Sequence, residues 1–123
     1  MSDKFATGME VRRKVLGDAH VDRVEANKTA LDTPFQTLIT EGAWGTVWAS
    51  DAISLRERSM LTLALLAATG NFDEIPMHIR ATANTGASQE DVMEVFQHVA
   101  IYCGVPKANH AIKLAKQTFA EMG

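Results

Sequence analysis

Apolar residues along this chain recur at spacings of three and four, and no segment alternates apolar and polar residues with a period of two. One stripe at helical spacing consists of Ala108, Ala111, Ile112, Ala115, Phe119 and Met122. A second stripe consists of Val92, Phe96, Val99 and Cys103. We expect Cys103 to be a small buried hydrophobic residue on that stripe. This periodicity predicts an all-α fold.

Capping signals and glycines divide the helical pattern into about six helices. Residues typical of capping boxes stand at 33–36, 54–57 and 88–91, and glycines stand where helices should end, at positions 70, 86 and 104. The candidate helices are residues 3–16, 20–32, 34–49, 55–69, 73–85, 88–103 and 106–122. Segment 55–69 is apolar almost all round after its first turn, so we expect it to be the buried central helix.

The length and the charge limit the kinds of protein that this chain can be. A chain of 123 residues predicts a single domain over 1–123. The 12 Lys and Arg against 15 Asp and Glu give a net charge of −3, which argues against a nucleic-acid partner. No apolar run approaches the ~20 residues of a membrane span, so we expect no membrane partner. The start of the chain has no apolar signal-peptide core, which favours the cytoplasm.

His78 is the histidine most suited to acid–base chemistry. It shares a helix face with the apolar Ile75 and Ile79, so its ring is expected to point inward. Glu74 precedes it by four residues, the spacing at which helical side chains meet. A carboxylate beside a buried imidazole orients it and raises its basicity, as a proton donor requires. The alternative is a core histidine that Glu74 satisfies.

The other histidines fit structural roles at least as well. His110 lies on the side of its helix away from the apolar stripe, which suggests a position facing solvent or another subunit. His98 lies among acidic and amide side chains and is expected on a solvated face. His20 stands at an expected helix start, where a capping or surface role is the default.

Arg56 and Arg58 stand in the first turn of the central helix, where positive charge opposes the helix dipole. Their presence therefore needs another reason, which is either an ion pair or an anionic ligand. Arg58 is the better ligand candidate because the side chains on its face, Thr62 and Leu65, belong to the apolar part of the helix.

Trp44 and Trp48 lie four residues apart on one expected helix. Two tryptophans so placed fill a core or a subunit interface, or they wall an apolar cavity around a small ring. The sequence leaves these alternatives open.

Several runs together resemble the carboxymuconolactone decarboxylase family, in order and nearly along the whole chain. The first set is RSMLTLA (58–64), HIRA (78–81), GASQEDV (86–92) and AIYCGVP (100–106). The second set is RRKVLGDAHV (12–21), WGTVW (44–48) and CGVPKANHA (103–111). The resemblance covers about residues 8 to 121.

The resemblance implies a helical bundle with the alkyl hydroperoxidase D-like fold, assembled into a homo-oligomeric ring, with a hexamer favoured. It also implies a cofactor-independent decarboxylation of a lactone dicarboxylate in the breakdown of protocatechuate. No metal and no cofactor is expected. The alternatives are a related lactone as substrate, or a non-catalytic oligomeric binding protein of the same fold.

The chemistry of such a substrate suggests a role for each candidate residue. We expect Arg58 to anchor a carboxylate or meet the developing oxyanion, and His78 to donate the proton with Glu74 orienting it. The substrate-binding candidates are Trp44 and Trp48 as an apolar wall, with His110 and Arg80 contributing from a subunit interface.

A sister branch, the alkyl hydroperoxidase D-like proteins, carries two cysteines of a Cys-x-x-Cys pair before the matching histidine. Counted back from His78, those cysteine positions hold Asn71 and Glu74. Because thiol peroxidase chemistry needs a thiolate and a resolving thiol, we expect this chain not to use it.

Overall fold

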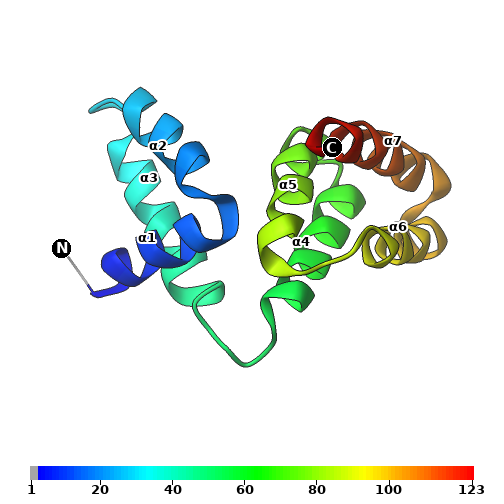
Figure 1. Ribbon diagram of the computed structural model, residues 1–123, viewed down its shortest axis with the longest axis horizontal. Helices are drawn as coiled ribbons and strands as arrows, with labels where there is room; N and C mark the ends of the chain where they lie inside the picture. Colours follow the sequence, from blue (N-terminus) through cyan, green and yellow to red (C-terminus); the bar gives the residue numbers. More distant parts are fainter. Residues whose placement is uncertain (1–2) are drawn as a thin grey trace. The chain divides into compact units, whose positions relative to one another are not determined.

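The computed structural model describes residues 3–123, and all regular structure in that range is helical. The chain forms two compact units, Met1–Ser54 and Leu55–Gly123, and each is described here by itself. Figure 1 draws the helices of the first unit in blue to cyan and those of the second in green to red. The all-α prediction is confirmed, whereas the single-domain assignment of 1–123 stays a prediction.

Three α-helices and a π-helix make up the first unit. They are α1 (Asp3–Leu16), α2 (Asp18–Asn27), α3 (Thr33–Ile39) and the π-helix η1 (Thr40–Val47). The prediction of one helix over 34–49 missed the change of helix type. In η1 the Trp48 N–H donates to the carbonyl of Ala43 at 2.8 Å, five residues back instead of four.

Glycines let α1 approach η1 closely. A Cβ atom on Gly8 would lie 2.0 Å from the carbonyl oxygen of Thr40, and one on Gly45 would lie 2.2 Å from the carbonyl oxygen of Lys4. These contacts join backbone to backbone, so no side-chain rotation could relieve a larger residue. Gly8 and Gly45 therefore set the packing of α1 against η1.

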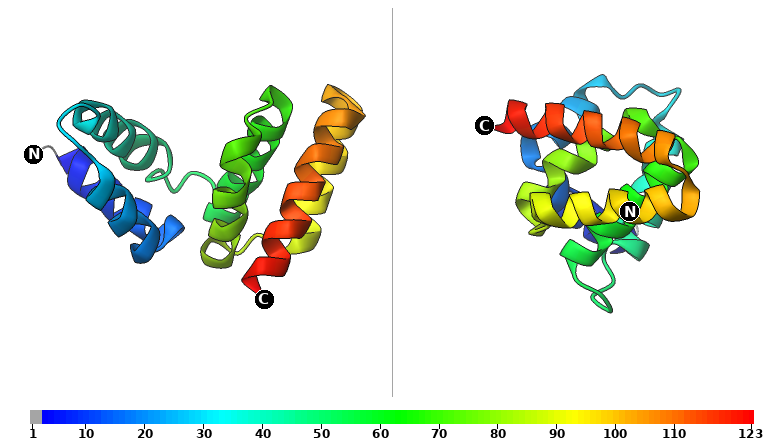
Figure 2. Two further views of the ribbon diagram at one scale, coloured as in Figure 1. Left: turned by 90° about the horizontal axis from the view of Figure 1, so that it is seen from above. Right: turned by 90° about the vertical axis from the view of Figure 1, so that its right-hand side faces the viewer.

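Four α-helices and one short 3₁₀ helix make up the second unit. They are α4 (Leu55–Thr69), the 3₁₀ helix η2 (Phe72–Glu74), α5 (Ile75–Thr85), α6 (Gln89–Cys103) and α7 (Val105–Met122). α4 packs against α5, α6, α7 and η2, so its central place is confirmed. α6 and α7 lie side by side in Figure 1 and in the left view of Figure 2.

The core of the second unit is built from the predicted stripes. Its buried members are Leu63, Ala67, Ile75, Ile79, Val92, Val95, Phe96, Val99, Ala108, Ala111 and Ala115. Two expectations about burial were wrong. α4 is not buried all round, because Leu61 and Leu65 are 53% and 63% exposed, and Cys103 is also exposed at the end of α6.

Helix ends follow the sequence signals in part. Ser88 and Asp91 form the predicted capping box of α6, and Gly86 ends α5 in the left-handed conformation with φ 89°. The box predicted at Thr33 was wrong, because α3 begins at Thr33 itself and Asp32 is the N-cap. In the described part of the chain, no helix is long and apolar enough to cross a membrane.

Candidate functional site

The first turn of α4 presents the two arginines to different surroundings. Arg56 makes two hydrogen bonds to the carboxylate of Asp91, from Nε at 2.8 Å and from Nη2 at 2.6 Å. This pair raises the pKa of Arg56 and holds the pKa of Asp91 far below its usual range. Of the two explanations that the sequence left open, the ion pair therefore accounts for Arg56. Arg58, two residues further along α4, is half-buried.

His78 lies on the buried face of α5, as predicted, with 8% of its surface exposed. On the same face, seven residues further along, the hydroxyl of Thr85 forms a buried hydrogen bond with that of Ser59 on α4, at 2.7 Å. Seven residues are two helical turns, or about 10 Å along the axis. Ser59 directly follows Arg58 on α4, so the Ser59–Thr85 bond joins the turn that carries Arg58 to the helix that carries His78.

Glu74 lies at the N-terminal end of α5, and His110 lies on the first half of α7. The two line one polar hollow of about 350 Å³ together with Asn71 and Phe72. The His110 ring packs on Phe72, with the ring centroids 4.0 Å apart. The structure thus brings together two residues that sequence reasoning had assigned to different roles. The orientation of His78 by Glu74 stays a prediction.

Arg80 is exposed on α5, and its guanidinium donates to Glu121 on α7 at 2.7 Å. Sequence reasoning did not foresee this pairing, since the two residues are 41 positions apart. A role for Arg80 in binding substrate has to be reconciled with this ion pair.

Trp44 and Trp48 belong to the first unit, where both are buried and their ring centroids are 5.0 Å apart. The π-helix places them, since Trp44 lies within η1 and Trp48 caps it. Within that unit they act as core residues, the first of the alternatives that the sequence left open. Extra-wide helical turns of this kind occur often at functional sites.

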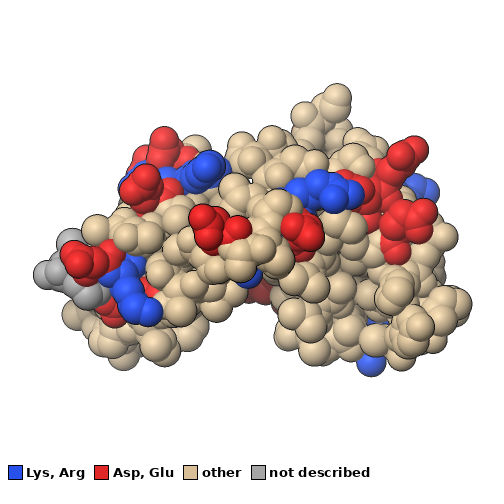
Figure 3. Space-filling model, turned by 90° about the horizontal axis from the view of Figure 1, so that it is seen from below, with Lys and Arg blue, Asp and Glu red and all other residues tan. Residues whose placement is uncertain are grey.

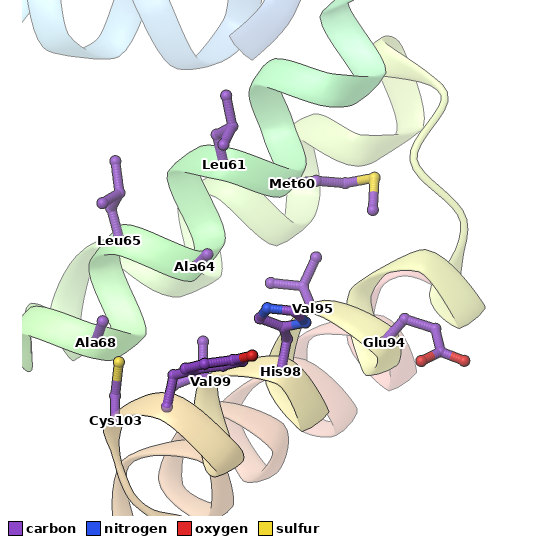
Figure 4. Close-up of a pocket in the computed structure, with 11 residues that line it drawn as sticks. Met60, Leu61, Ala64, Leu65, Ala68, Glu94, Val95, His98, Val99 and Cys103 are labelled. Carbon is purple, nitrogen blue, oxygen red and sulfur yellow. The ribbon is translucent and has the colours of Figure 1, made fainter.

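A groove of about 440 Å³ runs between α4 and α6 and was missed by sequence reasoning. Figure 4 shows Met60, Val95 and His98 turned toward one another between the helices, with Glu94 at the outer edge. His98 stacks on Tyr102, with centroids 4.8 Å apart. In the sequence, the spacing of four residues between His98 and Tyr102 could have indicated this stacking.

The groove is chemically unlike a site for a dianionic molecule. Its lining is mostly aliphatic, it includes one carboxyl side chain, that of Glu94, and it contains neither Lys nor Arg. The half-buried cation of Arg58 lies on the same helix, nearer its start, and remains the candidate for an anionic group. On the face shown in Figure 3, positive and negative side chains lie close together.

The described residues contain no group of three or more His, Cys, Asp or Glu side chains placed to hold a metal ion. The second unit contains the titratable candidates for binding and proton transfer that the sequence indicated. Arg58 supplies a fixed positive charge, His78 a buried imidazole, and the hollow at His110 a more accessible one.

Comparison with known proteins identifies a family over most of the chain. The sequence model of the carboxymuconolactone decarboxylase family matches residues 33–117. A 4-carboxymuconolactone decarboxylase of Acinetobacter baylyi is 37% identical over 120 residues, which is 98% of this chain and 90% of that protein. A nitrosuccinic acid decarboxylase of Metarhizium robertsii is 36% identical over 118 residues, covering 96% and 82% of the two chains. A 4-carboxymuconolactone decarboxylase sequence of Pseudomonas putida is 48% identical over 42 residues, covering 34% of this chain and 88% of that sequence.

Proposed function

Because this chain belongs to the carboxymuconolactone decarboxylase family and is a carboxy-lyase, we propose that its substrate is 4-carboxymuconolactone. The products would be 3-oxoadipate enol-lactone and CO₂, in the cytoplasmic breakdown of protocatechuate through the β-ketoadipate pathway. The observation that carries the proposal is the likeness to the Acinetobacter enzyme over 98% of the chain.

The substrate itself carries the electron acceptor for this reaction. The leaving carboxylate sits on the ring carbon next to the lactone oxygen, and a ring double bond lies between that carbon's neighbour and the carbon bonded to the lactone carbonyl. When the carbon–carbon bond to CO₂ breaks, its electron pair moves through the double bond onto the carbonyl oxygen. The dienolate that results is protonated on ring carbon. The protein must hold the second carboxylate, stabilise the oxyanion and deliver one proton.

We infer that residues of the second unit carry out these tasks. Arg58 would hold a carboxylate or meet the oxyanion, and His78 would donate the proton. Arg58 lies on α4 and His78 on α5, and the Ser59–Thr85 bond joins these two helices. His110 would contribute from its hollow beside Glu74. Burial of the leaving carboxylate would favour its loss as neutral CO₂.

Nitrosuccinic acid is the second candidate substrate, because the Metarhizium relative matches 96% of this chain. This acid also has two carboxylates, and its nitro group can accept the electron pair as a nitronate. The same cation and proton donor would therefore serve both reactions. The two substrates differ in shape, because only the lactone has a ring that can pack against an apolar surface.

We also infer that the chain assembles into a homo-oligomer, with a hexamer favoured, as its family resemblance suggests. Large apolar side chains exposed on the second unit support this inference. They include Leu61, Leu65, Ile101, Tyr102 and Val105. Apolar residues of this size gathered on one small unit are typical of surfaces that another subunit covers.

The test is a direct assay of the purified protein with each substrate in the presence of a chelator. We expect CO₂ release and enol-lactone formation from the lactone, with a higher kcat/KM than for nitrosuccinic acid. The reverse order would overturn the substrate assignment. If the folded protein decarboxylates neither, the binding-protein alternative is favoured. Sedimentation of the same sample should show an assembly larger than a dimer.

A further inference from the structure

The first turn of α4 is held from two sides by hydrogen bonds to other helices. On one side, Arg56 makes its two bonds to Asp91. Asp91 also accepts a bond from the backbone N–H of Ser88 at 2.9 Å, so the same carboxylate caps α6. On the other side, the hydroxyl of Ser59 bonds that of Thr85 on α5. α4 is thus tied to α6 and α5 at the same turn.

Arg58 lies between Arg56 and Ser59 in the sequence, so the hydrogen bonds of these two residues affect the direction in which Arg58 leaves the helix. Successive residues of an α-helix are rotated by about 100°, so Arg58 points about 200° from Arg56 and about 100° from Ser59. Once Arg56 is fixed toward α6 and Ser59 toward α5, the turn cannot rotate about its axis. The direction in which the Cα–Cβ bond of Arg58 leaves the helix is then determined.

Stability alone is a weak reason for these contacts. Arg56 has a side chain that is 49% exposed, and exposed ion pairs contribute little to folding. A two-bond arginine–carboxylate pair does, however, fix orientation strongly. The Ser59 and Thr85 hydroxyls are buried between helices, where an apolar pair would pack as well without specifying a register.

We propose that the Arg56–Asp91 pair and the Ser59–Thr85 pair position Arg58 for a carboxylate of the substrate. Arg56, Asp91, Ser59 and Thr85 are positioning residues, which act through Arg58 and do not touch the substrate. The Ser59–Thr85 bond also joins this turn to the helix of the proposed proton donor His78, since Thr85 and His78 share a face of α5. This inference rests on the proposed function, in which Arg58 binds the substrate.

The experiment compares Arg56→Lys and Thr85→Val with Arg58→Met in the decarboxylation assay. Arg56→Lys keeps the charge but cannot make the two-bond pair. Thr85→Val keeps the shape but removes the hydroxyl. Because a misplacement of about 1 Å can cost about 100-fold in rate, we expect kcat/KM to fall between 10- and 100-fold in both. Thr85→Ser, which restores a hydroxyl, should recover most of this loss.

Two matched variants control for general damage. Arg13→Met removes an arginine whose ion pairs, to Asp18 and Asp22, lie in the first unit. Thr118→Val removes a buried hydroxyl whose hydrogen bond stays within its own helix, to the carbonyl of Leu114. Both should keep kcat/KM within about twofold of the wild type, as surface and isolated changes do.

The decisive readout is the double variant Arg58→Met/Thr85→Val. If Thr85 acts through Arg58, adding Thr85→Val to Arg58→Met should lower kcat/KM no further, while the loss in Tm should still appear. Independent, multiplying losses in kcat/KM would overturn the positioning role. So would normal kinetics of Thr85→Val and Arg56→Lys beside an impaired Arg58→Met. Failure of the proposed function is distinguishable, because the wild type would then not decarboxylate the substrate at all.

Discussion

Replacing His78 by Asn removes the titrating group of the proposed proton donor while keeping a polar side chain of smaller size. General acid catalysis is worth about 10²- to 10⁴-fold in rate, which corresponds to about 3–5 kcal/mol of transition-state stabilisation. We therefore expect kcat to fall by a factor in that range, with little change in KM. A loss confined to kcat would mean that His78 acts on the transition state.

The structure also predicts a stability cost for His78→Asn, because the ring is 8% exposed on the packed face of α5. Such core changes lower the free energy of unfolding by about 1–3 kcal/mol, and that free energy is about 5–15 kcal/mol for a typical domain. The variant should stay folded at 25 °C with a lower Tm. Activity and stability can therefore be measured on the same preparation, and the lower kcat will not reflect unfolding.

His110→Asn is the matched comparison, since His110 is exposed and lines the hollow beside Glu74. It should lower Tm less than His78→Asn, because it removes a ring contact with Phe72 and little else of the core. A folded His78→Asn protein with unchanged kcat would refute the role given to His78. If His110→Asn were inactive in the same assay, the proton donor would lie in the hollow.

Two further predictions concern the scaffold and are read from Tm and urea unfolding. Gly8→Ala should lower the free energy of unfolding by about 1–3 kcal/mol or more, because its Cβ would meet the carbonyl oxygen of Thr40 at 2.0 Å. Gly42→Ala should be neutral or stabilising, because its Cβ would have no atom within 4 Å. Equal Tm values for the two variants would contradict this packing. The depressed pKa of Asp91 means that its pair with Arg56 stabilises the fold above the ordinary carboxyl pKa of about 4 and is lost as pH falls toward the folded-state value. The difference in free energy of unfolding between wild type and Asp91→Asn should therefore be largest near pH 7 and decrease below about pH 4. A difference that does not depend on pH would count against a stabilising role of the pair.

The helices were predictable because local signals mark their ends. The segments 3–16 and 55–69 coincide with α1 and α4, and the Ser88 box opens α6 as expected. The π-helix was not predictable, since η1 is only eight residues long and the four-residue spacing of Trp44 and Trp48 also fits an α-helix. Its close contact with α1 depends on glycines in both elements, which a local reading of either segment does not reveal.

Burial was predicted less well than helix position. Hydrophobic periodicity reports which residues avoid water, and not whether the partner that covers them lies in the same chain. Leu61, Leu65 and Cys103 were expected in the core, yet a single chain leaves them exposed. The proposed homo-oligomer offers a physical reason for this difference, because residues at a subunit contact have the same pattern as a core.

In the candidate site too, features that depend on one helix were predictable, whereas contacts between residues far apart in the sequence were not. The inward face of His78 followed from helical phase alone, and the structure buries it. The partner of Arg56 could not be foreseen, since Asp91 is 35 residues away and had been explained as a helix cap. The shared hollow of Glu74 and His110 likewise depends on how α5 and α7 meet, which no spacing within either helix encodes.

On the proposed function, a site with few chemical groups suits a substrate that carries its own electron acceptor. The protein then needs one fixed cation and one proton donor, and the substrate is selected by the distance and direction between them. In the positioning that we propose, the bond between Ser59 and Thr85 on the facing helices α4 and α5 contributes to both. A lactone and a nitro acid differ in where charge develops relative to the second carboxylate. We therefore expect changes in this helix packing, as well as changes in Arg58 or His78 themselves, to shift the preference of this chain between the two acids.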